Sequence, residues 1–296
     1  MSKLLTIFTP TYNRKNLLPK LYTSLLNQTS KNFIWMIIDD GSTDDTESVV
    51  REWIKECKEF QIEYYKKENG GLQSGYVEAI KHLETELAMC IDSDDCAVKN
   101  AVELIEMAWR ECDKEKYAGL YGLDCYADGN ILGGYFPQDV QIVDLIDFTI
   151  GKIKRSAQDR ALVIRTDLYK ATKPAKRYEY ERTMNATYLH LQIAENYKYV
   201  LVNRPLIVVN YQTDGISKNK KKQYISAPNT FADWRLYMLS LKGASLKFYL
   251  RHSIHYVSSC LFARRKIFVK ECEHKLLVAF ALPAGVLLNV YLRKFR

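Results

Sequence analysis

The chain has 296 residues, 47% of them hydrophobic and 26% charged, so it can bury one large core or a core with an appendage. Its 21 tyrosines and 11 phenylalanines, with only 13 glycines and 7 prolines, exclude a disordered or fibrous chain. The 7 cysteines contain no C-x-x-C pair, which favours reduced, mostly buried thiols over a zinc or disulfide framework.

The net charge of +8 is unevenly distributed along the chain. Residues 215–296 hold 16 basic and 3 acidic side chains, whereas the rest of the chain holds 27 basic and 32 acidic ones. Basic charge suits nucleic acid or an anionic membrane, and an acidic region suits a metal-assisted site. We therefore expect the two parts to face different partners.

Short apolar runs alternate with amphipathic segments in the first 112 residues. The pattern predicts strands at Leu4–Thr9, Phe33–Ile38, Ile62–Lys66 and Leu87–Ile91, and helices at Asn16–Asn27, Glu47–Phe60, Ser74–Glu84 and Ala101–Cys112. Such repetition predicts a doubly wound, mostly parallel mixed α/β sheet, with ligands bound beyond the carboxyl ends of the strands. No G-x-G-x-x-G or Walker-type glycine loop is present, so a dinucleotide or P-loop site lacks its main signal.

The alternation becomes less regular beyond about residue 117. Further strands are expected at Tyr117–Tyr126, Ala161–Ile164, Tyr199–Val202 and Leu206–Tyr211. The lysine-rich stretch Ser217–Gln223 indicates a flexible loop or linker. After it, three helical stretches are predicted at Pro228–Leu241, Ser245–Lys270 and Glu273–Leu292.

Two acidic clusters directly follow predicted strands. They read Ile37-Ile38-Asp39-Asp40-Gly41-Ser42 and Met89-Cys90-Ile91-Asp92-Ser93-Asp94-Asp95. In a parallel sheet both should lie at one edge, where their repulsion needs a cation or a ligand donor to offset it. A hard divalent ion does this with oxygen ligands and phosphate. The alternative is that the acids of the first cluster, with Asp44 and Asp45, are only turn and cap residues.

Four segments in order resemble the donor-site motifs of family-2 inverting glycosyltransferases, which have the GT-A (nucleotide-diphospho-sugar transferase) fold. They are Ile7–Arg14 (I-F-T-P-T-Y-N-R), Ile37–Asp44 (I-I-D-D-G-S-T-D), Glu68–Gly71 (E-N-G-G) and Ile91–Asp95 (I-D-S-D-D). The resemblance covers residues 1 to about 112 well and continues loosely to about 211. It implies a glycosyltransferase domain at 1–215 (donor-nucleotide half 1–112, acceptor half 113–215) and does not extend to the C-terminal helices. There, charge and helical pattern predict a basic linker at 216–227 and a basic helical, membrane-associating or oligomerising extension at 228–296.

The resemblance also implies a reaction and a site. The reaction would be metal-dependent, inverting transfer of a sugar from a nucleotide-sugar donor, expected to be UDP-linked, to a glycan or lipid-linked glycan. The implied donor-binding residues are Thr9, Pro10, Thr11, Tyr12, Asp40, Asn69, Gly70, Asp92 and Ser93. Asp40 would accept a hydrogen bond from a uracil-like N–H, and Asp94, supported by Asp95, would bind Mn²⁺ or Mg²⁺ bridging the diphosphate. Tyr12 is equally compatible with a packing role.

The sequence departs from the family pattern at two places. Many members continue the third motif with a Lys-His pair and a later Asn, where this chain has Leu72, Gln73 and Val77. Relatives also carry a catalytic Asp or Glu six residues before a basic residue on a later helix. If Gln192 matches that basic residue, Ala186 occupies the position of the base.

An inverting transfer needs a base near the acceptor hydroxyl. We expect Glu181 to serve, with Glu179 and His190 as alternatives, although a histidine on a helical face more often packs. The pair Asp159-Arg160 resembles an acceptor-side segment but also suits a surface ion pair. The second hypothesis is a non-catalytic sugar-nucleotide-binding or partner subunit of a glycan-assembly complex that has lost the base.

The C-terminal segment Leu276–Leu292 is apolar except for Asn289, and Arg293 and Lys294 follow it. It is short for a membrane span, which needs about 20 residues. The pattern predicts an interfacial helix on an anionic membrane, and the alternative is a helix packed on the catalytic domain or in a homo-oligomer. With no signal-peptide pattern at the N-terminus, we expect a cytoplasmic protein, peripheral on the inner face of the cell membrane, that binds no nucleic acid.

Overall fold

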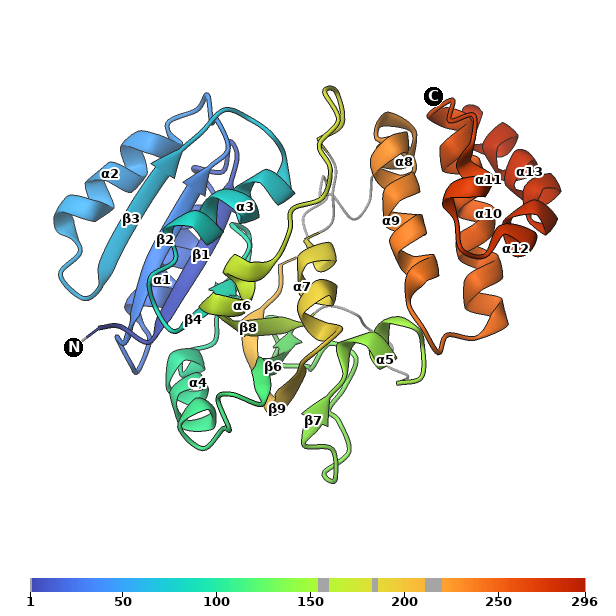
Figure 1. Ribbon diagram of the computed structural model, residues 1–296. Coiled ribbons are helices and arrows are strands. Elements are labelled where there is room, and N and C mark those ends of the chain that lie inside the picture. The colour runs from blue at the N-terminus through green and yellow to red at the C-terminus, as the bar shows by residue number, and fades with distance from the viewer. Residues whose placement is uncertain (1, 154–159, 183–185, 211–219, 296) are drawn as a thin grey trace. The chain divides into compact units, whose positions relative to one another are not determined.

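The structure is a computed structural model that describes residues 2–153, 160–182, 186–210 and 220–295 (Figure 1). The chain divides into two compact units. The sheet unit comprises Met1–Leu145, Lys154–Pro174 and Leu189–Gln212, and the helical unit comprises Ile146–Ile153, Ala175–Tyr188 and Thr213–Arg296. Each unit is described by itself below.

The described strands form one nine-stranded mixed sheet. The strands are β1 Leu5–Thr11, β2 Phe33–Asp39, β3 Gln61–Lys66, β4 Leu87–Cys90, β5 Cys96–Ala97, β6 Tyr117–Cys125, β7 Ile142–Val143, β8 Ala161–Arg165 and β9 Lys198–Val208. Their order is β3-β2-β1-β4-β8-β6-β9-β5, and β7 pairs with β9. The first four strands in this order are mutually parallel, and β8 lies antiparallel to both β4 and β6. The predicted mixed α/β sheet is therefore confirmed.

The helices before residue 200 connect these strands. They are α1 Leu18–Leu26, α2 Thr46–Glu56, α3 Leu72–His82, α4 Ala101–Arg110, α5 Leu145–Thr149, α6 Thr166–Ala171 and α7 Thr187–Ala194. The double winding follows from the alternation of side chains along β1. Ile7 belongs to the core cluster that contains Leu21 of α1 and Val102 of α4, whereas the ring of its neighbour Phe8 lies 5.0 Å from that of Tyr76 in α3. Helices thus cover both faces of the sheet.

The helical unit contains α8 Lys220–Ser226, α9 Pro228–Ser240, α10 Leu246–Phe262, α11 Phe268–Glu271, α12 Lys275–Phe280 and α13 Leu282–Arg293. Its core cluster includes Ala232 of α9, Tyr256 of α10 and Val278 of α12. In the part of the chain that the structure describes, no helix is both long and apolar enough to cross a membrane.

The helical unit differs from the sequence-based prediction in two places. Residues 220–226 form α8 where a linker is predicted, because buried Tyr224 donates a hydrogen bond to the His255 carbonyl at 2.5 Å; residues 211–219 of the predicted linker lie outside the described residues. The helix predicted over Ser245–Lys270 ends at Phe262, because Arg264 adopts a left-handed conformation with φ 55°.

Candidate active site

The carboxyl ends of β1, β2 and β4 lie side by side at one edge of the sheet. Thr11 is paired with Asp39 across the parallel β1–β2 ladder, and Phe8 is paired with Cys90 across β1–β4. The chain that leaves each strand therefore emerges at the same edge, with the first acidic cluster after β2 and the second after β4. This is the place where an open α/β sheet positions ligands.

Asp39 anchors the turn after β2 rather than facing outward. Its side chain is fully buried, accepts the Ser42 amide at 2.7 Å and accepts the hydroxyl of Tyr64. Burial and the hydrogen bond to this carboxylate raise the pKa of Tyr64, so its hydroxyl stays a donor. For Asp39 the turn-residue interpretation of the first cluster is the one that the contacts favour.

Asp40 fastens the glycine loop of the third motif to the end of β2. Its Oδ1 atom pairs with Lys67 Nζ at 2.7 Å and accepts the Gly70 amide at 2.9 Å. The same atom also accepts the Ser74 hydroxyl at 3.2 Å, and Oδ2 accepts the Gly71 amide at 2.7 Å. Oδ2 has a single donor among these contacts and is the oxygen with room for another.

Asn13 links the loop after β1 to the loop after β2. Its backbone is left-handed, with φ 53°, a conformation that asparagine tolerates better than most residues. Its amide donates to Ser42 Oγ at 2.9 Å, and its side-chain Oδ1 accepts the Thr43 amide at 2.8 Å. Neither Asn13 nor Lys67 has a local sequence signal for these roles, because both act through contacts between segments far apart in the chain.

The predicted residues of β1 are unequally accessible. Thr9 is fully buried and its hydroxyl accepts the Trp35 indole N–H at 3.1 Å, so the side chain holds the sheet together. Tyr12, by contrast, is 46% exposed, as expected for a side chain that is available to a ligand. Buried polar atoms normally have a hydrogen-bond partner, yet Thr11 Oγ1 and, in the first turn of α3, Gln73 Nε2 have none among the residues that the structure describes.

The second acidic cluster forms a turn after β4. The Asp95 amide donates to the Asp92 carbonyl at 3.0 Å, and Asp95 Oδ1 accepts the Asn210 amide at 2.7 Å. Ser93 is buried, Asp92 is exposed and Asp94 is partly exposed. Among the residues that the structure describes, the Asp94 carboxylate forms no hydrogen bond or ion pair, so it is the acid of this cluster left for a ligand.

The donor set of this turn fits a hard cation only in part. Within the described ranges, no group of three or more His, Cys, Asp or Glu side chains could hold a metal ion. Asp94 and Asp92 offer carboxylate oxygens, which are the ligands that Mg²⁺ and Mn²⁺ prefer. Because Mg²⁺ is often held by one or two carboxylates together with substrate phosphates, a diphosphate would complete the shell.

The structure gives Glu181 a role in the helical unit. Its Oε1 accepts the Asn229 amide at 3.0 Å and the Asn229 side-chain amide at 2.9 Å. Its Oε2 accepts the Thr230 amide and the Thr230 hydroxyl, both at 2.7 Å. Both oxygens therefore bind donors at the start of α9, an arrangement typical of a helix cap. That Glu181 is the catalytic base stays a prediction.

The other base candidates fall in different surroundings. His190 is buried in α7 and lies 2.9 Å from the Tyr169 hydroxyl; burial and the nearby Arg160 lower its pKa to about 3, so it is a neutral packing group near pH 7. Glu179 is exposed, and Ala186 is 5% exposed just before α7. Asp159 lies outside the described residues.

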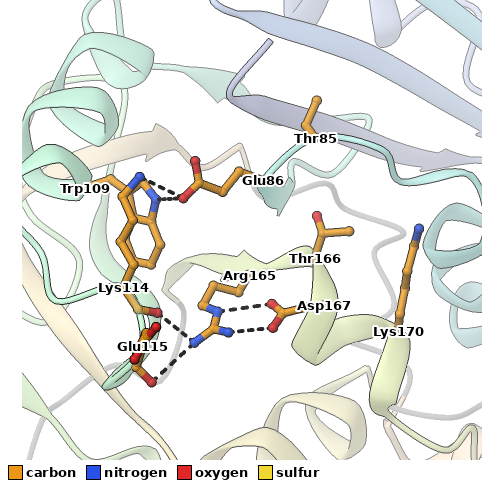
Figure 2. A pocket seen from close by; sticks show the side chains of 9 residues that line it. All are labelled: Thr85, Glu86, Trp109, Lys114, Glu115, Arg165, Thr166, Asp167 and Lys170. Atoms are coloured by element: carbon orange, nitrogen blue, oxygen red, sulfur yellow. Dashed lines mark hydrogen bonds and ion pairs between the residues drawn. The ribbon is translucent and has the colours of Figure 1, made fainter. Parts of the chain in front are cut away.

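A cavity of about 450 Å³ opens at the amino end of β4, at the opposite end of the strand from the second acidic cluster. Figure 2 shows two pairs among its charged side chains: Arg165 binds Asp167 through two hydrogen bonds, and Lys114 binds Glu86 at 2.8 Å. Glu86 precedes β4, whereas the second acidic cluster follows β4. The cavity is therefore separate from the acidic edge.

Residues 6–119 match the sequence model of the family described as "Glycosyl transferase family 2". A curated relative, an "Uncharacterized glycosyltransferase" of Rickettsia bellii, is 32% identical over 149 residues, which are 46% of this chain and 20% of the relative. The first three curated relatives are matched over only 20–24% of their own length.

Two solved structures share the fold of the chain. S. aureus TarS 1–349 in complex with UDP-GlcNAc has a TM-score of 0.57 at 16% identity, covering 96% of this chain and 80% of that one. The mannosyltransferase PcManGT of Pyrobaculum calidifontis, in complex with GDP-Man and Mn²⁺, has a TM-score of 0.53 at 15% identity, covering 97% and 87%. The predicted GT-A-type fold and the family-2 resemblance are confirmed.

Proposed function

We propose that this chain, in which residues 6–119 form a family-2 glycosyltransferase domain, transfers a sugar from a UDP-linked donor to a glycan or lipid-linked glycan with inversion. The observation that carries the proposal is the Asp94 carboxylate, which lies at the sheet edge where the donor motifs meet and has no hydrogen-bond or ion-pair partner among the described residues. TarS, which shares the fold at 16% identity, is in complex with UDP-GlcNAc.

The residues at the edge have distinct tasks in this proposal. Asp40 holds the glycine loop in place through the Gly70 and Gly71 amides, and its Oδ2 accepts a further N–H from a uracil-like base. Tyr12 packs against the base or ribose, and Asp92 and Ser93 contact the ribose or phosphate region. Together these contacts orient the donor before the acceptor attacks.

We also propose that donor binding needs Mn²⁺ or Mg²⁺, held by Asp94 with Asp95 in support. A bound divalent ion would neutralise the charge that builds on the departing nucleoside diphosphate. PcManGT, of the same fold, is in complex with Mn²⁺. Because Asp95 already accepts the Asn210 amide, its task is to orient the turn that carries Asp94.

Calorimetry with UDP, with and without Mn²⁺, tests the donor site. Asp94→Ala should weaken Mn²⁺-dependent UDP binding by roughly tenfold or more, because the small site loses a ligand that nothing replaces. Asp139→Ala, which removes an exposed acid elsewhere in the chain, is the matched control and should bind as the wild type does. An unchanged Mn²⁺ dependence in Asp94→Ala would show that the site is wrongly placed.

A second candidate is a donor-binding subunit without transferase activity. The contacts that favour it are the buried Ala186 at the expected base position and the full engagement of Glu181 at α9. Hydrolysis and transfer assays with a panel of sugar nucleotides separate the two. UDP binding with no hydrolysis or transfer for any donor would favour the subunit, and any Asp94-dependent turnover would favour the enzyme.

We place the reaction at the inner face of the cell membrane, where a lipid-linked acceptor is available. The basic excess of residues 215–296 supports this location, because an anionic leaflet attracts Lys and Arg within a Debye length of its surface. Homo-oligomerisation through the same helices is the alternative, and sedimentation of the full chain without lipid tests it.

A further inference from the structure

The last two helices form a nearly continuous rod, which we call the terminal helix (residues 275–293). The Ala281 amide donates to the Leu277 carbonyl and the Gly285 amide donates to the Ala281 carbonyl, both at 2.9 Å, so the hydrogen-bond ladder crosses the junction of α12 and α13. Pro283 has no N–H, so one bond of this ladder is missing there. Because the bonds of Ala281 and Gly285 still cross the junction, residues three to four positions apart stay on the same side of the rod.

The face of the terminal helix that packs on α10 is small and polar at Gly285 and Asn289, between the partly buried Leu282 and the buried Leu292 of α13. A Cβ atom at Gly285 would lie 3.1 Å from the Ile254 carbonyl oxygen and would clash with the Val257 side chain, so only glycine fits. Asn289 is 3% exposed, and its side chain donates to the Ser258 carbonyl at 3.1 Å. Glycine and asparagine thus occupy positions where a globular helix normally places its apolar stripe.

The opposite face of the terminal helix is apolar and exposed. Leu276 is 88% exposed, Phe280 76% and Leu287 70%, and Val290 and Tyr291 follow at 55% and 49%. Their spacing of three to four residues, continued by exposed Pro283 and Ala284, puts them on one side of the rod. A contiguous exposed apolar face of this kind marks an interaction surface.

Charge indicates what covers this face. Lys275 is exposed at one end of it, and Arg293 and Lys294 are exposed at the other. Lys221 of α8 adds a cation near the second end, with its ammonium 3.9 Å from the centre of the Phe295 ring. Residues 275–295 contain no Asp or Glu, so a second copy of the face would bring like charges together, whereas an anionic surface complements it.

We propose that the terminal helix lies flat on an anionic bilayer, with Phe280 and Leu287 at the boundary between headgroups and acyl chains and the terminal cations on lipid phosphates. Apolar area and basic charge together supply the two signals that stable peripheral binding needs. This docking surface deepens the proposed function, since it rests on the placement of the reaction at a membrane.

Vesicle flotation of the full chain tests the proposal. The chain should float with vesicles of phosphatidylcholine and phosphatidylglycerol, float poorly with phosphatidylcholine alone and be released by high salt. Leu287→Glu should weaken partitioning by roughly tenfold or more, because it puts a charge into the apolar face. The matched control is Met107→Glu, at a residue of α4 that is 56% exposed; it should float as the wild type does.

Three outcomes would overturn the proposal. The first is flotation of Leu287→Glu equal to that of the wild type, with circular dichroism confirming that both are folded. The second is no flotation of the wild type with anionic vesicles. The third is a wild-type dimer, seen by light scattering, that Leu287→Glu dissociates, which would assign the face to a second copy.

A second variant keeps the test informative if Leu287→Glu does not fold. Lys275→Glu with Lys294→Glu changes only exposed residues and should cut flotation with anionic vesicles roughly tenfold. UDP binding measured in the same samples separates the two proposals. Flotation without UDP binding would leave the docking surface intact and contradict the donor site, and the reverse would contradict only the docking surface.

Discussion

Glu181 and Thr230 are joined by two hydrogen bonds of 2.7 Å, from the amide and the hydroxyl of Thr230 to one carboxylate oxygen. Asn229 binds the other oxygen, so a residue of the loop before α7 caps α9. This relationship predicts that Glu181→Ala lowers the free energy of unfolding by about 1 to 2 kcal/mol, the usual effect of a lost cap. Urea unfolding measures it, and Glu179→Ala, at an exposed neighbour, should have little effect.

Turnover distinguishes the cap from a general base. Loss of a base typically costs a factor of about 10² to 10⁴ in rate while donor affinity stays nearly constant. If Glu181 is the base, Glu181→Gln should bind UDP normally and lose turnover by that factor. Both oxygens of Glu181 already accept hydrogen bonds in the structure, which argues against a base. Glu179→Gln, at the alternative candidate, is therefore measured in the same assay. Full turnover of Glu181→Gln would rule Glu181 out, and the same test would then apply to Glu179 and His190.

The mostly parallel sheet and its acidic edge could be predicted, because both follow from local patterns. Alternating apolar runs such as Phe33–Asp39 form parallel strands, and parallel strands share an edge. What each acid does there could not be predicted. Asp39 and Asp40 are neighbours in sequence, yet one is buried under Tyr64 and the other binds a loop 30 residues on.

Which segments of the chain make up the helical unit could not be predicted from the sequence either. Tyr178, in a segment predicted to belong to the acceptor half, donates to Asp233 of α9 at 2.7 Å, and Arg265 donates to the same hydroxyl at 2.9 Å. Burial and the hydrogen bond to Asp233 raise the pKa of Tyr178 to about 12. Neither contact has a local signature, since the three residues lie 32 to 87 positions apart.

Asp40→Asn tests whether the glycine loop belongs to the donor site. The amide keeps one acceptor for the loop but removes the counter-charge of Lys67, whose ammonium is mostly buried and then keeps only neutral acceptors such as the Ser74 hydroxyl; this should cost about 1 to 3 kcal/mol of unfolding free energy. UDP affinity should fall roughly tenfold, because the loop loses its fixed position. Asp45→Ala removes an exposed ion pair with Lys15 and serves as the control for both measurements. Lower stability with unchanged UDP affinity would show that the loop lies outside the donor site.

The lowered pKa of His190 should make the free energy of unfolding depend on pH. Burial and Arg160 lower its pKa to about 3, well below the value of about 6.5 in the unfolded chain, so the folded state favours the neutral ring. The resulting stability is fully present above pH 6.5 and is lost as the pH falls towards 3, because the unfolded state binds a proton that the folded state excludes. Between pH 6.5 and 5 this group should contribute a loss of up to about 2 kcal/mol in the free energy of unfolding.

His190→Gln, which retains a side chain able to hydrogen-bond Tyr169, should remove that part of the loss in urea unfolding at the two pH values. His252 and His255, whose pKa values burial also lowers, to about 3 and about 4, remain in the variant, so a smaller pH dependence will persist. Parallel stability curves for the wild type and His190→Gln would contradict the prediction.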